Sequence, residues 1–410
     1  MNIVYIHQHF ATARGTTATR TYDFARFLAD RGHRVTVVTG VFGSGDVRVE
    51  PRGGWVLHQE VEGFSLRVVN VRYDNKQGFW RRIIAFLVFM VVATVEVLRI
   101  RDADVVFATS TPLTVGIPGT VAWYVRRVPF VFEVRDIWPE SAVAVGALGN
   151  PAVVAVARMA ERLFYRAARR IIAISGRMAD RLRARIGSDG RKLRVIPLGA
   201  DVRLFDEAKP DHAWRQRSGL QGTFVAVYAG THGRVNALPQ VLEAAAHLRD
   251  EPNVRIVLIG DGALKPDLRE QVRRRGLTNV VLLNPMPKTQ LAGVLKACDM
   301  GLMTLENLPV FDTACPNKFM DYLAAGLPVL VNFDGEAGWI SEAAGCGIVV
   351  PPEDPEAMAS AIRDLARAPA RAADMGRRAR QLAADRFDRR NLIEHFEALL
   401  LQAAGGKAKS

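Results

Sequence analysis

The chain has 410 residues. A typical domain has about 100–200 residues, so we expect two domains, each large enough to bury its own core. Hydrophobic residues make up 49% of the chain and charged residues 24%, which excludes a disordered protein, and the net charge of +13 favours a polyanionic partner such as nucleic acid, an acidic membrane surface or a phosphorylated substrate.

The N-terminus and the cysteines indicate a compartment. The chain begins with the apolar run 3–6, which no basic segment precedes, so the sequence shows no signal peptide and predicts a cytoplasmic protein. The three cysteines, Cys298, Cys315 and Cys346, are too few for a disulfide framework and form no C-x-x-C pair, which argues against structural zinc.

Short runs rich in Val and Ile alternate with helical stretches along nearly the whole chain. The predicted strands are 3–6, 35–39, 105–108, 130–134 and 171–174, then 224–229, 254–259, 280–283, 301–304 and 329–332. Runs without polar alternation are typical of parallel strands buried on both faces. Two such series predict an α/β fold of two doubly wound, Rossmann-like domains, 1–200 and 201–376. In the remaining part, 377–410, we expect one helix over 377–404 that packs back across the first domain, and a flexible tail.

The run 83–95 departs from this pattern because it contains no charged residue. A membrane-spanning helix needs about 20 such residues, so this run is too short to cross a bilayer. Two interpretations stay open. The run is either a fully buried helix of the first domain or an interfacial helix, with Trp80, Arg81 and Arg82 at the level of the lipid headgroups.

Polar residues follow two predicted strands of the first domain, where doubly wound sheets place ligand loops. After the first strand come His9 and the loop with Gly15 and Thr16. The loop after strand 130–134 contains Arg135, Asp136, Trp138 and Glu140. Its charges are costly to bury unless they are paired or used. Either Arg135, Asp136 and Glu140 form an ion network that braces the loop, or the loop binds a ligand.

In the second domain, two strand-to-helix turns contain small residues that would let an anion approach backbone N–H groups. The first turn has Gly230 and Arg234, and the second has Gly260 and Gly262, with Lys265 in the opening of the next helix. Glycines at such turns also occur for turn geometry alone, and an exposed, solvated lysine is the usual case.

The segment 315–329 carries the strongest signal. Pro316 suits a helix start and Gly326 a C-terminal cap. Asn317 lies in the first turn of that helix, and Lys318 and Asp321 share one face because they are three residues apart. The lysine and the helix terminus would hold a diphosphate, and the carboxylate would accept ribose hydroxyl protons. The alternative is a surface ion pair between Lys318 and Asp321.

Segment 315–329 resembles retaining glycosyltransferases of family 4, which have the GT-B fold. Runs 171–175, 195–201 and 347–354 are also similar to that family, so the resemblance covers almost the whole chain. It implies an active site in the cleft between the domains, a nucleotide-sugar donor on the second domain, retention at the anomeric carbon, and neither a cofactor nor a bound metal. The D-x-D pattern Asp102–Asp104 leads directly into a strand, so we predict no metal site there.

The family commonly has two glutamates eight residues apart, and here Thr313 and Asp321 take their places. Run 132–141 (FEVRDIWPES) resembles the corresponding run of a bacterial cell-surface polysaccharide subgroup. This subgroup includes enzymes resembling the N-acetyl-L-fucosamine transferase of O-antigen synthesis. By this resemblance Asp136 and Lys318 are catalytic. The implied donor-binding residues are Gly15, Thr16, Gly230, Arg234, Gly260, Gly262, Lys265, Asn317, Lys318 and Asp321. The implied acceptor- or sugar-binding residues are His9, Arg135, Asp136, Trp138 and Glu140.

The resemblance therefore implies a hexosyl- or N-acetylhexosaminyl-transferase that uses a nucleotide-diphosphate donor, with UDP the usual nucleotide of the family, and a lipid-linked, polyprenyl diphosphate acceptor. Two other functions stay open, a nucleotide-sugar epimerase of the same architecture and a noncatalytic nucleotide-sugar-binding protein. The sequence shows no helix-turn-helix or RNA-recognition signature, so it does not favour nucleic acid.

The positive charge is concentrated in two stretches of the first domain. Residues 158–194 hold twelve basic and three acidic residues, and residues 67–101 hold seven basic and two acidic ones. Within the first stretch an arginine recurs every four positions, which predicts a basic stripe on one helix face, formed by Arg158, Arg162, Arg166 and Arg170. We therefore predict that the first domain docks on the anionic inner face of the cell membrane, through this stripe and the Trp80–Arg82 segment, and receives a lipid-linked acceptor there.

Overall fold

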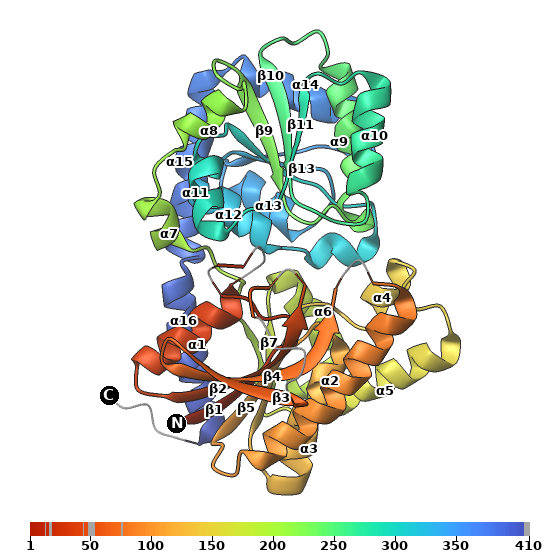
Figure 1. Cartoon of the computed structure of the whole chain (residues 1–410), viewed down its shortest axis with the longest axis vertical. Helices are drawn as coiled ribbons and strands as arrows, with labels where there is room; N and C mark the ends of the chain where they lie inside the picture. Colours follow the sequence, from red (N-terminus) through yellow and green to blue (C-terminus); the bar gives the residue numbers. More distant parts are fainter. Residues whose placement is uncertain (13, 16–18, 44, 48–53, 75–76, 406–410) are drawn as a thin grey trace. The chain divides into compact units, whose positions relative to one another are not determined.

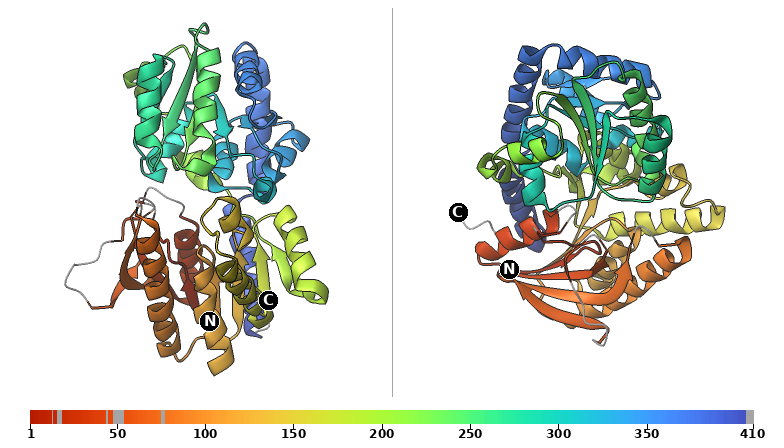
Figure 2. Two further views of the ribbon diagram at one scale, coloured as in Figure 1. Left: turned by 90° about the vertical axis from the view of Figure 1, so that its right-hand side faces the viewer. Right: turned by 45° about the horizontal axis from the view of Figure 1, so that its top comes forward.

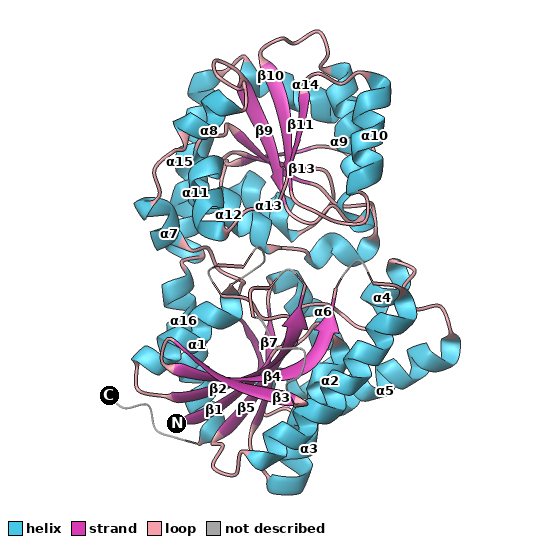
Figure 3. Ribbon diagram, viewed as in Figure 1, coloured by secondary structure: helices cyan, strands magenta, loops and turns pink. Residues whose placement is uncertain are grey.

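The computed structural model describes residues 1–12, 14–15, 19–43, 45–47, 54–74 and 77–405. The chain divides into two compact units, one of Met1–Pro197 together with the segment from Asn391, and one of Leu198–Arg390 (Figure 1). The predicted fold class is confirmed, because each unit is a mainly parallel sheet with helices on both faces (Figure 3). All ten predicted strands are present.

The first unit contains an eight-stranded sheet with the order β3-β4-β2-β1-β5-β6-β7-β8. Its strands are β1 (Asn2–Ile6), β2 (Arg34–Phe42), β3 (Val56–Val61), β4 (Phe64–Tyr73), β5 (Val105–Thr109), β6 (Phe130–Val134), β7 (Arg170–Ala173) and β8 (Leu193–Val195). Neighbouring strands are parallel except β3 and β4, which pair antiparallel. The sequence analysis missed β3, β4 and β8. The edge strand β3 has no fully buried residue, so it lacks the apolar run by which the other strands were predicted.

Helices cover both faces of this sheet (Figure 2). They are α1 (Arg20–Asp30), α2 (Phe79–Arg99), α3 (Gly116–Arg126), α4 (Glu140–Ala144), α5 (Pro151–Ala167), α6 (Gly176–Ile186) and α16 (Arg389–Ala404). One core joins α1 and α16 to the sheet, with Phe396 packed 4.7 Å, centroid to centroid, from Phe107. On the other face, Gly116 of α3 faces the ring of Phe164 in α5, and Phe89 of α2 approaches Gly40 of β2.

The second unit contains a six-stranded sheet with the order β11-β10-β9-β12-β13-β14, and its paired strands are all parallel among the residues described. Its strands are β9 (Phe224–Ala229), β10 (Val254–Ile259), β11 (Val280–Leu283), β12 (Met300–Met303), β13 (Val329–Val331) and β14 (Gly347–Val349). Its helices are α7 (Val202–Glu207), α8 (His212–Arg217), α9 (Leu238–His247), α10 (Lys265–Arg275), α11 (Lys288–Lys296), α12 (Asn317–Ala325), α13 (Glu336–Ala343), α14 (Pro355–Ala366) and α15 (Pro369–Arg386).

The single C-terminal helix expected over 377–404 is wrong, because α15 and α16 are separate helices. Between them, Ala200 pairs with Asp388 in an isolated parallel bridge. The N–H of Ala200 donates to the carbonyl of Phe387 and its carbonyl accepts from the N–H of Arg389, at 2.6 and 3.0 Å. These bonds hold the backbone extended, so the helix is interrupted there. The part from Asn391 onwards then belongs to the first unit.

The run 83–95 lies in α2, and one of its two interpretations is wrong. The helix is not fully buried: Phe89 and Ala93 on its inner face are fully buried, but a stripe on its outer face is 43–58% exposed. This outer stripe consists of Ile84, Leu87, Val91 and Val95. Among the described residues, no helix is both long and apolar enough to cross a membrane.

The strand order indicates where each sheet would bind a ligand. In the first sheet the order reverses between β1 and β5, and in the second between β9 and β12. Ligands of doubly wound sheets bind at the carboxyl ends of the strands beside such a reversal. Ligand-binding residues are therefore expected after Ile6 and Thr109 in the first unit, and after Ala229 and Met303 in the second.

Candidate functional site

Three side chains of the second unit meet at the carboxyl ends of β9 and β12 and the start of α12. Lys318 Nζ donates to the hydroxyl of Tyr228 and to Asn236 Oδ1, each at 2.9 Å. The ammonium group also lies 4.3 Å from the centre of the Tyr228 ring, in cation–π geometry. We call Lys318, Tyr228 and Asn236 the lysine cluster.

In the lysine cluster, no carboxylate balances the charge of Lys318. Within the described ranges, Lys318 forms no ion pair with a carboxylate, and its two hydrogen-bond partners are neutral. Burial lowers the pKa of Lys318 to about 7 because a charged ammonium loses its hydration there. The sequence analysis missed Tyr228 and Asn236. The alternative interpretation of Lys318 and Asp321 as a surface ion pair is wrong, because Lys318 bonds to Tyr228 and Asn236 and Asp321 pairs with Lys288. A buried cation with neutral partners suits an anionic ligand.

Other groups that suit an anion lie beside the lysine cluster. A side chain at Gly230 would come within 3.3 Å of Lys318 Cε, so the glycine keeps this space open. Arg234 opens the turn that contains Asn236, and its guanidinium has no hydrogen-bond or ion-pair partner in the described part of the chain. Asn317 is the first residue of α12, whose N-terminal N–H groups favour negative charge.

Asp321 has a partner that the sequence analysis missed. Its Oδ1 lies 3.0 Å from Nζ of Lys288, the first residue of α11, and both side chains are about nine-tenths buried. The sequence offers little to predict this partner. Lys288 directly follows Pro287, which ends the loop before α11, and a lysine at such a position is usually solvated. The ion pair fixes the carboxylate one turn into α12 and leaves Oδ2 for a ligand.

Three residues expected at the donor site have structural roles instead. Lys265 is 4% exposed, and its Nζ donates to the carbonyls of Gly260 and Leu283 and to Asn284 Oδ1 at 2.6–2.9 Å. The amine therefore braces the ends of β10 and β11 and has no proton left for a phosphate. Gly260, with φ of 153°, packs against the carbonyl of Gly230, and Gly262 packs against the backbone of His232. A side chain at either glycine would separate the two turns.

Thr313 stands where the family commonly has its first glutamate. It is 5% exposed, and its hydroxyl donates to the carbonyl of Val310 at 3.3 Å. A buried threonine that bonds within its own turn does not replace a glutamate that would contact a sugar.

In the first unit, a buried ion pair lies where β6 ends. Arg20 Nη2 and Glu133 Oε1 are 2.6 Å apart, and the side chains are 2% and 1% exposed. Thr109 donates to the other carboxylate oxygen, and Arg20 also donates to the carbonyl of Pro197, each at 2.6 Å. This network joins β5, β6 and α1 to Pro197, the last residue of the segment Met1–Pro197.

One of the two interpretations of the loop after β6, an ion network of Arg135, Asp136 and Glu140, is wrong. Asp136 is exposed and accepts a hydrogen bond from the Thr111 hydroxyl, and the Arg135 N–H donates to Ser110 Oγ at 3.0 Å. Glu140 pairs instead with Arg185 at 3.0 Å and with Arg158 at 3.7 Å. Arg185 also donates to the backbone carbonyl of Trp138 at 3.2 Å, so this pairing fixes the loop and leaves Asp136 accessible.

His9 lies after β1, packed among aromatic rings, with centroids 4.5 Å from Tyr73 and 5.0 Å from Phe42. Burial, followed by the charges of Arg135 and Arg82, lowers the pKa of His9 to about 3, so the imidazole is neutral at physiological pH. Its Nε2 has no hydrogen-bond partner among the residues described. Gly15 is buried and its N–H donates to the Thr12 carbonyl at 3.0 Å, and Thr16 lies outside the described residues.

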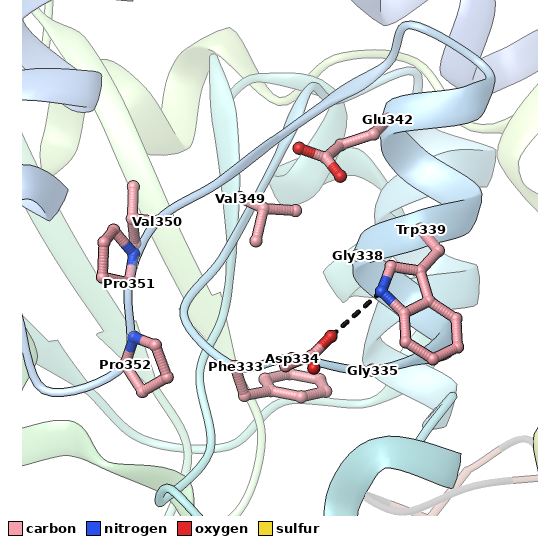
Figure 4. A pocket seen from close by; sticks show the side chains of 10 residues that line it. All are labelled: Phe333, Asp334, Gly335, Gly338, Trp339, Glu342, Val349, Val350, Pro351 and Pro352. Carbon is pink, nitrogen blue, oxygen red and sulfur yellow. Dashed lines mark hydrogen bonds between the residues drawn. The ribbon is translucent and has the colours of Figure 1, made fainter.

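A cavity of about 310 Å³ opens in the second unit beside the carboxyl ends of β13 and β14 (Figure 4). Its lining includes Asp334, Trp339 and Glu342, and Trp339 Nε1 donates to Asp334 Oδ1 at 3.0 Å. The sequence analysis did not select any of these residues. Within the described ranges, no group of three or more His, Cys, Asp or Glu residues could hold a metal ion.

Comparison with known proteins identifies the family of the chain. The Glycosyl transferase 4-like domain matches residues 15–199, and the Glycosyl transferases group 1 domain matches residues 223–368. Among curated relatives, "Probable glycosyltransferase WbjE" of Pseudomonas aeruginosa is 25% identical over 65% of this chain and 67% of its own length. A D-inositol 3-phosphate glycosyltransferase of Kineococcus radiotolerans is 29% identical over 65% of both chains. WcaI, a candidate colanic acid biosynthesis glycosyl transferase of Escherichia coli, is 29% identical over 42% of both chains. The chain thus spans between two fifths and two thirds of these relatives.

Among solved structures, Anabaena Alr3699/HepE in complex with UDP-glucose has a TM-score of 0.74 at 20% identity, covering 98% of this chain and all of the other. This similarity establishes the fold. Because the two matched domains together span most of the chain, the protein belongs to the group 1, family 4-like glycosyltransferases of the GT-B fold.

Proposed function

We propose that the protein is a retaining glycosyltransferase that moves a hexosyl or N-acetylhexosaminyl group from a UDP donor to a lipid-linked saccharide in bacterial surface polysaccharide synthesis. The lysine cluster carries this proposal, because a buried lysine with only neutral partners suits an anion such as a diphosphate. The solved UDP-glucose complex of a protein with this fold and the colanic acid description of WcaI support the donor and the polymer class. In this proposal the second unit binds the donor and the first unit binds the acceptor.

On the donor side, Lys318 and Arg234 hold the diphosphate together with the N-terminus of α12. Their charge stabilises the diphosphate as the bond to the anomeric carbon breaks, which is preorganised electrostatic catalysis. The diphosphate leaves from the face that the acceptor attacks, so the configuration is retained. The observed carboxylates do not assign a nucleophile and acid pair of the kind that a double displacement needs. On the acceptor side, the exposed Asp136 accepts the proton of the attacking hydroxyl.

Asp321 anchors the ribose in this proposal. Replacing Asp321 by Ala should raise the apparent KM for the donor by about tenfold or more, because a hydrogen bond to a charged group contributes about 1.5–3 kcal/mol. Asp321→Glu keeps the carboxylate that the family usually has, and it should keep the donor KM within a few-fold of wild type. Steady-state kinetics with a varied donor measures both. Unchanged donor kinetics in Asp321→Ala would refute this role.

The first unit has a surface suited to an anionic membrane. The apolar outer stripe of α2 runs from Ile84 to Val95, between the exposed Trp80 and Arg81 at one end and Arg99 at the other. An open apolar cavity of about 550 Å³ lies along the same helix, lined by Trp55 and five residues of the run 87–95. Arg158, Arg162 and Arg166 are exposed on α5. We therefore propose peripheral attachment of the protein to the inner face of the cell membrane.

Two details of the sequence prediction for this surface are wrong. Arg170 belongs to β7 because α5 ends at Ala167, so the basic stripe on the helix has three members. Arg82 packs inward, with its guanidinium carbon 5.8 Å from the centre of the Tyr73 ring, whereas Trp80 is 74% exposed.

Attachment can be tested by cosedimentation with anionic liposomes at low salt. Replacing Val91 by Asp should weaken binding by about tenfold or more, because burying a Val side chain contributes roughly 1.5–3 kcal/mol. Replacing Arg158, Arg162 and Arg166 by Gln together should weaken it by about 100-fold, at about 1 kcal/mol per arginine. The control is Val195→Asp on the edge strand β8, a residue that is also exposed. Wild-type protein that stays in the supernatant at low salt would contradict attachment.

The activity itself is tested by screening UDP-sugars against polyprenyl diphosphate-linked saccharides, with UDP release and the product linkage measured. Transfer with retained configuration supports the proposal. Isomerised donor without acceptor would identify an epimerase, and binding of UDP without turnover would identify a noncatalytic protein. Transfer to a soluble inositol phosphate, but not to lipid-linked saccharides, would overturn the acceptor class.

A further inference from the structure

Helix α2 starts at the ligand edge of the first sheet. Strand β4 is parallel to β2 and ends at Tyr73, and α2 begins at Phe79, so the start of the helix lies at the carboxyl edge of the sheet, where ligands of such sheets bind. The ring of His9 is at the same edge, 4.5 Å from the ring of Tyr73, centroid to centroid. From there α2 runs back toward the start of β5 (Figure 1). A ligand bound at this edge can therefore continue along the helix.

An apolar cavity of about 550 Å³ follows the second half of α2. This volume is within the range for small-molecule sites, about 300–1,000 Å³. From Leu87 to Val95 the helix covers about 12 Å, at about 1.5 Å per residue, so the apolar wall is long and suits a chain better than a compact ring. We call this cavity the α2 groove. It is lined by Trp55, Val56, Leu87, Val88, Val91, Val92, Val95, Glu96 and Arg99.

The far end of the α2 groove is an ion cluster. Glu96 is 1% exposed, and its carboxylate oxygens lie 2.9 Å from Arg67 and 2.5 Å from Arg99. Arg67 belongs to β4, so these pairs fasten the end of α2 to the sheet. An apolar ligand that enters from the ligand edge can extend as far as this cluster.

Basic side chains lie at the near end, between the ligand edge and the α2 groove. Arg81 is exposed on the first turn of α2, and its spacing from Val88 and Val92 places the three residues on one face of the helix. Along the helix, Arg81 precedes Val88 by about 10 Å. The guanidinium of Arg82 lies over the Tyr73 ring, at 5.8 Å. A phosphate at this end would therefore meet positive charge, and a hydrocarbon attached to it would lie toward the groove.

The order of these groups favours one kind of ligand. A polar strand edge is followed by basic side chains and then by an apolar groove, which matches a lipid phosphate with a polar head group and a single chain. A bilayer surface covers the exposed stripe of α2, whereas filling the cavity requires that one chain leaves the bilayer. A second copy of the protein fits less well, because residues 67–101 hold seven basic and two acidic residues, and two such surfaces repel each other.

We propose that the α2 groove binds the hydrocarbon chain of the lipid-linked acceptor, with Arg81 at the phosphate and the saccharide at the ligand edge beside His9. The inference rests on the proposed function, which supplies a polyprenyl diphosphate acceptor. It goes beyond membrane attachment, because it assigns one chain of the substrate to a defined cavity. Affinity then depends on chain length, since each further methylene that is buried in the groove strengthens binding.

The test measures binding of geranyl phosphate and geranylgeranyl phosphate to the full-length protein by calorimetry, without membranes. The two ligands share the phosphate and differ in chain length. Geranylgeranyl phosphate should bind at least tenfold more tightly, because a geranyl chain that starts at Arg81 ends near Val88. Val92→Phe narrows the groove and should bring the two affinities within twofold of each other. The matched control is Ile84→Phe, at an exposed position of the same helix outside the groove lining, which should leave the ratio unchanged.

Two further variants separate the chain from the phosphate. Leu87 is 48% exposed, so Leu87→Ala leaves the core intact, and it should reduce the ratio of affinities several-fold. Arg81→Gln should weaken binding of both phosphates by the same factor and leave the ratio unchanged.

Equal affinities of the two phosphates for the wild-type protein would overturn the inference. A ratio that Ile84→Phe lowers as much as Val92→Phe would also overturn it, because it indicates general adsorption to the apolar surface. Lysophosphatidylglycerol that binds as tightly as geranylgeranyl phosphate, with the same response to Val92→Phe, would identify a bilayer lipid as the occupant and overturn the assignment to the acceptor. A wild-type dimer in sedimentation that Leu87→Ala dissociates would identify a second copy instead.

Failure of the proposed function gives a different result. If no sugar is transferred to polyprenyl-linked saccharides but the binding ratio responds as expected, the proposed function is wrong and the groove for a lipid phosphate stands. If sugar is transferred with equal KM to acceptors with geranyl and geranylgeranyl chains, the proposed function stands and the groove is overturned.

Discussion

UDP should bind about 50-fold more weakly at pH 9 than at pH 7. Lys318 has a pKa of about 7 in the free protein, because burial disfavours its charged form. A bound diphosphate favours the ammonium and raises this pKa, so UDP binding takes up a proton wherever the free amine is neutral. The contribution of Lys318 to affinity is fully present below pH 7 and is lost as the pH rises above it. Between pH 7 and pH 9 the protonated fraction of the free lysine falls from about one half to about one hundredth, which gives the expected factor.

Calorimetry at several pH values, in buffers of different ionisation enthalpy, measures both the affinity and the proton uptake. At pH 8 the uptake should be about 0.9 proton per UDP bound, since the phosphates of UDP are already ionised above their pKa of about 6. The Lys318→Arg variant stays charged throughout this range, so its affinity should hardly change with pH. Lys318→Met should bind weakly at all pH values. A wild-type affinity that is independent of pH would show that Lys318 is charged before UDP binds.

Removing Arg20 should destabilise the first unit by about 3–5 kcal/mol. Arg20 and Glu133 are almost fully buried, so the Arg20→Met variant leaves the Glu133 carboxylate without its counter-charge in a low-dielectric environment. The expected loss in the free energy of unfolding is a large fraction of the stability of an ordinary domain, about 5–15 kcal/mol. Denaturant unfolding followed by circular dichroism would measure it.

An exposed pair on the same helix provides the matched control. Arg26 lies 3.2 Å from Glu62, and both side chains are about half exposed. Arg26→Met should therefore cost less than about 1 kcal/mol. The double variant Arg20→Met, Glu133→Leu removes both charges and should recover part of the loss, since burying no charge costs less than burying one. A loss of less than 1 kcal/mol in Arg20→Met would contradict the importance of this ion pair.

Most of the fold could be predicted from the sequence. Runs such as 224–229 and 254–259 are apolar without alternation, and strands buried on both faces require that composition, so their bounds agree with β9 and β10. Strand β3 could not be predicted this way, because it is an edge strand with no fully buried residue. The break between α15 and α16 could not be predicted either, since it depends on backbone bonds to Ala200, a residue almost 190 positions earlier.

The candidate site was predicted less well than the fold. Motif position selected Lys318, Asp321 and Arg234, which remain in the proposed donor site, and it also selected Lys265, whose amine braces two strand ends. A lysine in the first turn of a helix looks the same in the sequence whether it meets a ligand or a backbone carbonyl.

The length of the chain was sufficient to predict two domains, the order of its apolar runs to predict the α/β fold, and the positions of its charges to predict a basic first half. They were sufficient because burial on two faces and charge density are properties of local segments. The tertiary structure alone decided which charges are paired. Lys288 meets Asp321, Arg185 meets Glu140, and Lys318 meets two neutral groups, each across a distance in sequence that no local pattern encodes. The chemistry of the site depends on these pairings, because they decide where each charged side chain is held and which charge the fold leaves without a counter-charge.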